Sequence, residues 1–207
     1  MTAEHDQARD DLAFMRSLIG GGEKFQATAG ELFMWAGTLY GLQCLGEWLD
    51  TVGVIQLPPL GHLFLGVAPT AVFLIVLTRV IWRDRKAPKG GPTTRALTAV
   101  FTGAGIANLI LAVVFAFGAH VEQSMTVWLY HPVVVCLFQG VAWYVAWSMR
   151  KRAWVGLVAL GWFALTLTLG VTIYNVGAFL LTLGVGLILL MAIPGYAMTR
   201  IAKQSGA

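Results

Sequence analysis

Long apolar stretches separated by short charged segments dominate the pattern of this chain. Residues 96–149 contain one charged side chain, Glu122, and residues 153–199 contain none. A helix needs about 20 mainly apolar residues to cross a bilayer, at about 1.5 Å per residue. Each stretch is therefore long enough for two spans. A third pair is predicted over residues 29–82, where two acidic residues and Pro58-Pro59 interrupt the apolar pattern.

The pattern predicts an all-α polytopic membrane protein with six transmembrane helices in three hairpins. An alternative with five spans needs one helix of more than about 40 residues, which no bilayer accommodates. The transmembrane bundle then covers residues 29–198, with one polar tail before it (1–28) and another after it (199–207). The predicted spans are 29–49, 60–82, 96–118, 127–149, 153–174 and 177–198.

Basic residues determine the predicted orientation. The 14 Lys and Arg side chains fall in four groups, in the two tails and in the connections after the second and fourth spans. With six spans all four groups share one face, and the positive-inside rule makes that face cytoplasmic. Both termini are therefore predicted to be cytoplasmic. Glu47, Asp50 and Glu122 are the acidic residues that this leaves on the outer face.

Composition narrows the class of protein. Hydrophobic residues make up 57% of the 207 positions and charged residues 12%, with 24 glycines in addition. A soluble domain has about 25% charged residues and keeps roughly 30% of its accessible surface in water. These values exclude a soluble enzyme, a disordered chain and a nucleic-acid-binding protein. The first partner of such a chain is the lipid bilayer.

The N-terminal tail carries a predicted short amphipathic helix. Residues 8–19 place apolar side chains on one helical face, and Gly20-Gly21-Gly22 is expected to end that helix. The segment either binds a cytoplasmic protein or lies on the membrane surface as an anchor. Thr28 and Glu31 match a capping box, which predicts that a new helix begins there.

Three amide side chains fall inside predicted spans, where a polar group facing lipid is costly. Gln43, Asn108 and Gln139 either join helices through hydrogen bonds or line a polar path through the bundle. Cys44 and Cys136 lie in the outer halves of two spans. They either pair as a disulfide or are separate buried apolar residues.

Small residues recur every four positions in two spans. Gly37 and Gly41 form a G-x-x-x-G pattern in the first span, and Ala99, Gly103 and Ala107 repeat in the third. Such faces allow two helices to approach closely. They predict contacts within the bundle or between copies in a homo-oligomer.

Histidines near the outer face form the main candidate site. His62 and His131 lie at similar depths and could be axial ligands of a b-type haem. His62, His120, Glu122 and His131 could instead hold a divalent metal ion such as Zn²⁺. The group could also sense external pH, since histidine changes charge between pH 5 and 8. The remaining alternative is that these side chains only reach the lipid headgroups.

Two segments resemble a group of uncharacterised bacterial six-helix inner-membrane proteins. The first is DDLAFMRSLI with the following GELFMWAGTLYGLQCLGEW, and the second is MRKRAWVGLVALGWFALTLTLG. The resemblance implies a multi-pass protein of the bacterial inner (plasma) membrane. It implies no role for any residue.

Recognisable catalytic motifs are absent from the sequence. The chain has no G-x-S-x-G, Walker A, G-x-G-x-x-G or H-E-x-x-H pattern. The sequence therefore favours an integral membrane protein that is not an enzyme, such as a small sensor, accessory factor or partner subunit. The alternatives are a haem- or metal-binding redox protein that uses the outer histidines, and a transporter of a small solute or ion.

Overall fold

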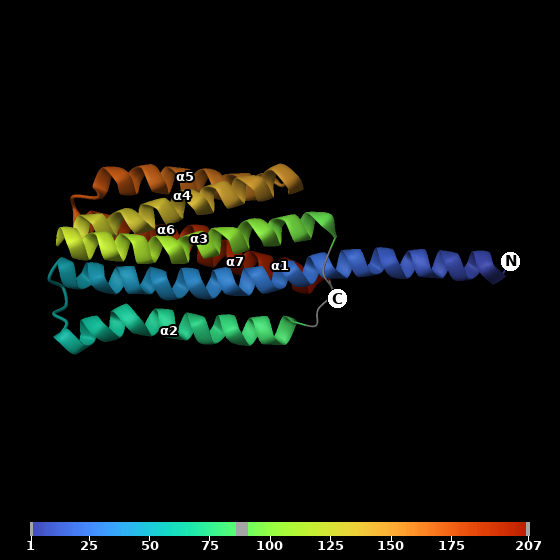
Figure 1. The fold of residues 1–207 in the computed structure, drawn as a ribbon, viewed down its shortest axis with the longest axis horizontal. Coiled ribbons are helices and arrows are strands. Elements are labelled where there is room, and N and C mark those ends of the chain that lie inside the picture. Colours follow the sequence, from blue (N-terminus) through green and yellow to red (C-terminus); the bar gives the residue numbers. More distant parts are fainter. Residues whose placement is uncertain (1, 86–90, 206–207) are drawn as a thin grey trace.

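The protein is a bundle of long helices. A computed structural model describes residues 2–85 and 91–205, with side chains over 26–85 and 91–204. Helices and their short connections account for all of the described residues, which include no strand. The all-α prediction is therefore confirmed. The helices are α1 (Thr2–Thr51), α2 (Pro59–Asp84), α3 (Pro92–Glu122), α4 (Met125–Arg150), α5 (Ala153–Thr172), α6 (Val176–Leu187) and α7 (Ile193–Ser205), and a π-helical turn, η1 (Ile188–Ala192), joins α6 to α7 (Figure 1).

Five helical segments are long and apolar enough to cross a membrane. They are α2, α3, α4, α5 and the continuous segment Val176–Gln204 that contains α6, η1 and most of α7. These segments match five of the six predicted spans and support a multi-pass membrane protein. The remaining prediction, 29–49, falls within α1, which is not among the five. The mean hydropathy of this part of α1 is lowered by Gln43, Glu47 and several glycines.

The prediction of a separate tail helix is wrong. α1 continues without a break from Thr2 to Thr51, through Gly20-Gly21-Gly22 and through Thr28. A glycine lowers the stability of a helix by about 1 kcal/mol relative to alanine. The helix ends at the glycine only if its φ and ψ angles leave the helical region. The Thr28–Glu31 capping box is also absent, because Thr28 lies inside α1 and its hydroxyl donates to Asp84 Oδ2 instead.

The helices run alternately in opposite directions, so the two described chain ends lie at the same end of the bundle (Figure 1). That end, where Arg85 follows α2 and Lys151-Arg152 joins α4 to α5, is called the basic end below. The opposite end, where residues 52–58 join α1 to α2 and residues 123–124 join α3 to α4, is called the histidine end. α1 alone extends far beyond the bundle, at the basic end (Figure 1).

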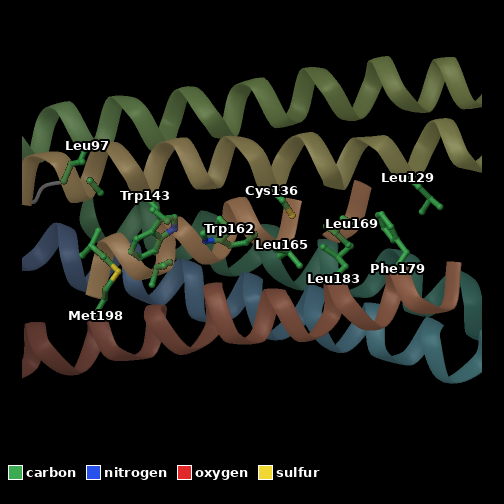
Figure 2. Packing of buried hydrophobic residues seen from close by; sticks show 14 of the residues in the cluster. Leu97, Leu129, Cys136, Trp143, Trp162, Leu165, Leu169, Phe179, Leu183 and Met198 are labelled. Atoms are coloured by element: carbon green, nitrogen blue, oxygen red, sulfur yellow. The ribbon is translucent and has the colours of Figure 1, made fainter. Parts of the chain in front are cut away.

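The core lies between α1, α4, α5 and the α6–α7 segment. α1 packs along α2, α6, η1 and α7, α4 packs between α3 and α5, and α5 contacts α6. Trp162, Leu169 and Phe179 are almost fully buried in a row of apolar side chains along the bundle (Figure 2). α2 and α3 leave most of their apolar side chains exposed, as helices that face lipid do.

Glycines allow α1 to touch the backbone of the last segment. A Cβ atom added to Gly37 would lie 2.4 Å from the Ala192 nitrogen and 2.9 Å from the Leu187 carbonyl oxygen, so the two helices meet backbone to backbone at η1. Gly41 faces Ile188 in the same interface, as its spacing from Gly37 predicts. Gly103, from the other small-residue pattern, has open space where a Cβ would lie.

Candidate functional site

His62 lies between two carboxylates at the histidine end. Its Nδ1 is 3.5 Å from Glu47 Oε2, and its Nε2 is 3.4 Å from Asp50 Oδ2. The carboxylates lie three residues apart on the last turns of α1, and His62 is in the first turn of α2. Each ring nitrogen of His62 therefore has one carboxylate of the neighbouring helix beside it.

The connection between α1 and α2 holds these three side chains in position. Asp50 Oδ1 accepts a hydrogen bond of 2.7 Å from the backbone N–H of Leu57. Gly53 adopts a left-handed conformation, with φ +76°, which turns the chain back toward α2. Pro58 and Pro59 then begin α2 one turn before His62, because proline fits the first positions of a helix. The cluster of Glu47, Asp50 and His62 is called the carboxylate–histidine cluster below.

His131 has a different setting. Its Nε2 lies 3.0 Å from Asn108 Oδ1, and its ring stacks on Trp128 with centroids 5.1 Å apart and planes 20° apart. The hydrogen bond joins α3 to α4, so Asn108 contributes to helix–helix contact, one of the two roles expected of it. His62 thus faces α1, whereas His131 faces α3.

The histidines expected to hold a metal ion are not brought together. Among the described residues, no group of three or more His, Cys, Asp or Glu side chains has an arrangement suited to a metal ion. His120 and Glu122 are exposed at the end of α3. The structure therefore does not show His62, His120, Glu122 and His131 converging, and a metal ion held by these four side chains stays a prediction. A haem between His62 and His131 stays a prediction.

The remaining predicted residues have separate surroundings. Gln43 is half-buried in α1. The Gln139 Oε1 atom is buried without a hydrogen-bond partner, as are the indole nitrogens of Trp143 and Trp162. The sequence gives no signal that either indole is unpaired, although Trp143 follows Gln139 by one helical turn. Cys44 and Cys136 are both free thiols.

A polar network joins α1 to α2 near the basic end. Arg83 Nη1 lies 2.9 Å from Glu31 Oε2, and Arg83 also donates two hydrogen bonds of 3.1 Å to Asp84. Thr28 donates to the same Asp84 carboxylate. The sequence offered one signal for this network, since Thr28 and Glu31 are three residues apart and so share a helical face. α1 and α2 are therefore joined by charged contacts at both ends.

Comparisons with known proteins add no family. No protein-family model, no curated protein and no solved structure matches this chain. A functional argument must therefore come from its own residues. The most distinctive arrangement they provide is the carboxylate–histidine cluster at one end of a helix that leaves the bundle at the other end. Chemically, an imidazole between two carboxylates can take up a proton and form two ion pairs.

Proposed function

We propose that this protein is a six-span inner-membrane protein that acts as a small sensor or accessory subunit, with no catalytic role of its own. The observation that carries the proposal is the length of α1, which is one helix of 50 residues. Its last turns hold Glu47 and Asp50 beside His62, and its first half projects from the opposite end of the bundle (Figure 1). A change at the cluster is thereby joined to the projecting tail through one continuous helix.

Residues 29–49 of α1 are the sixth span in this proposal. Two features support it: this part of α1 lies along α2 and the α6–α7 segment, which are both apolar enough to cross a membrane, and an even number of spans puts every Lys and Arg group on one side. The positive-inside rule then makes the basic end cytoplasmic. The carboxylate–histidine cluster faces the periplasm, and residues 8–19 are available in the cytoplasm to contact a partner protein.

The proposed input is protonation of His62. The charged side chains in contact with its ring are Glu47 and Asp50, both from α1. A protonated imidazole is attracted to both carboxylates, whereas a neutral one can donate to only one of them. Protonation therefore draws the start of α2 toward the end of α1. Since α1 spans about 75 Å, a tilt of about 5° near residue 40 moves position 8 by about 4 Å.

A distance measurement tests this coupling. Spin labels are attached at Ala8→Cys and Lys151→Cys in a chain whose Cys44 and Cys136 are replaced by alanine, and the distance is measured in lipid nanodiscs at pH 8 and pH 5.5. We expect the distribution to shift by up to about 4 Å, depending on how far the movement is directed along the line between the two labels. His62→Gln should abolish the shift. His120→Gln, which removes an exposed histidine at the same end, should retain it.

Two results would contradict the proposal. A distribution that does not change with pH, or that changes equally in His62→Gln, would remove the sensor function. The span count has its own test, in which single cysteines at Ala8, Gln56 and Lys203 are labelled with an impermeant maleimide on intact spheroplasts. Labelling of Gln56→Cys alone is expected. Labelling of Ala8→Cys together with Gln56→Cys would show that residues 29–49 do not span, and labelling of Lys203→Cys without Gln56→Cys would refute the orientation.

A further inference from the structure

A small apolar pocket lies at the basic end of the bundle, on the opposite side of the protein from the carboxylate–histidine cluster. Its volume is about 30 Å³, which is room for about two water-sized groups. Helices α1, α3, α4, α5 and α7 all contribute to its wall, so it lies where most of the bundle converges. The lining residues are Ala29, Phe33, Leu97, Phe101, Trp143, Ala146, Arg150, Trp154, Val155 and Met198.

Arg150 is the charged residue in this lining, and it has no carboxylate partner among the described residues. Its Nη1 donates a hydrogen bond of 3.2 Å to Gln26 Oε1, and its other donors have no acceptor among the side chains that the structure describes. Gln26 Nε2 is itself buried without a partner. Trp143, which is 3% exposed and lines the pocket, also has an indole N–H without a partner. Arg150 and Trp143, which line the pocket, therefore carry donors that lack an acceptor among the described side chains, and so does Gln26 next to Arg150.

Two further features add positive charge. Arg150, Lys151 and Arg152 are consecutive, and Lys151 has a left-handed conformation that turns the chain directly into α5. Arg152 is the N-cap of α5, and no side chain accepts a hydrogen bond from the first turn of that helix. The first N–H groups of a helix favour an anion. Trp154 and Val155 of that turn line the pocket, although the Val155 N–H already donates to the Arg152 carbonyl oxygen and is not available to an anion.

We propose that Arg150, beside this pocket, binds the phosphate group of an anionic phospholipid from the leaflet at the basic end, and that the pocket takes the adjoining carbon atoms of the headgroup. Unpaired donors require an acceptor, and a phosphate diester supplies several acceptor oxygens with one negative charge. The apolar walls suit the carbon atoms attached to that phosphate and disfavour a fully hydrated free ion. Arg150 ends α4 and Ala153 begins α5, both candidate spans, so the site lies at the depth of the headgroups. Given its volume, the pocket holds part of the headgroup, while the acyl chains remain in the bilayer.

Lipid titration by native mass spectrometry tests this site. The whole protein is delipidated in detergent and titrated with phosphatidylglycerol or with phosphatidylcholine, whose choline cation is repelled by the Arg150–Arg152 run. We expect phosphatidylglycerol to bind about tenfold more tightly than phosphatidylcholine, and Arg150→Gln to remove that difference. Arg85→Gln is the matched control, because Arg85 is also at the basic end but stacks on Trp82 outside the pocket. It should change the affinity by less than about twofold.

Other outcomes overturn the proposal. Equal loss of affinity in Arg85→Gln and Arg150→Gln would show attraction to net charge without a site. Displacement of phosphatidylglycerol by about 10 mM inorganic phosphate would assign the pocket to a free anion. If Arg150→Gln fails to fold, Ala146→Val narrows the pocket and leaves every donor in place. That variant should lose the preference for phosphatidylglycerol, and if it keeps the preference the lipid does not occupy this pocket.

Discussion

Replacing Gly37 by alanine should break the closest contact in the bundle. The added Cβ would lie 2.4 Å from the Ala192 nitrogen, 2.9 Å from its Cα and 2.9 Å from the Leu187 carbonyl oxygen. All three atoms belong to the backbone at the two ends of η1, so no rotamer change can relieve the clash. Ordinary van der Waals contact begins near 3.4 Å. α1 and the α6–α7 segment must therefore separate by about 1 Å.

The cost of that separation follows from packing. Adding a methyl group to a well-packed interior costs about 1–3 kcal/mol. A gap of about 1 Å also removes roughly a quarter to a half of the dispersion energy of each contact across the interface. Those contacts include Gly195, where a Cβ would be 2.4 Å from the Met34 nitrogen. Since helix association in lipid depends mainly on such packing, we expect Gly37→Ala to lower the free energy of unfolding by about 3 kcal/mol.

Unfolding in mixed micelles of increasing SDS content measures this effect, with tryptophan fluorescence as the readout. Gly103→Ala is the control, because it makes the same chemical change inside a helix where nothing lies within 4 Å of the new atom. Gly41→Ala should fall between them, since its nearest neighbour is the Ile188 side chain, which can move. If Gly37→Ala and Gly103→Ala agree within about 0.5 kcal/mol, the packing argument is wrong.

Three further predictions use the same unfolding assay. A double-mutant cycle of Asn108→Leu and His131→Phe should give a coupling energy of about 0.6 kcal/mol, typical of interhelical hydrogen bonds in membranes; a value of zero would mean that the bond is not formed. Gly53→Ala should cost about 1 kcal/mol because φ at this position is +76°, although nothing lies near the added atom. Thr28→Val should cost about 1 kcal/mol through loss of its hydrogen bond to Asp84, and an unchanged stability would remove that bond from the α1–α2 contact.

The ends of most helices could be predicted from the sequence because charge and proline mark them. The predicted span 127–149 corresponds to α4, Met125–Arg150, and the predicted span 60–82 to α2, Pro59–Asp84. In both cases the helix ends within two residues of a cluster of basic side chains. These signals act locally, since a charged side chain cannot enter the hydrocarbon layer without a large cost. Counting residues from these charged clusters is then sufficient to predict where a spanning helix begins and ends.

The tail could not be predicted in the same way. Gly20-Gly21-Gly22 contains strong helix-breaking residues, but a break also needs an alternative partner for the backbone groups that leave the helix. Residues 8–19 before them and the bundle helix after them are both helical, and the helix continues in phase between the two. Each glycine is less favourable than alanine in a helix by about 1 kcal/mol, which is only weak evidence against a continuous helix. This continuity matters for the proposed function, because a tail broken at these glycines could not transmit a tilt of α1.

The sequence predicts how deep in the bundle the two histidines lie, but not which neighbouring side chains they face. Counting from the span ends correctly places His62 and His131 near the same end of the bundle, but the rotation of each helix decides what the ring meets. Helix α2 packs on α1, which turns His62 toward Glu47 and Asp50, whereas α4 packs on α3, which turns His131 toward Asn108. One residue of register corresponds to about 100° of rotation, so a small error in the packing face moves a side chain to another neighbour. The side chains of a shared metal site must agree both in their depth in the bundle and in the direction they face. The sequence supplies only the depth.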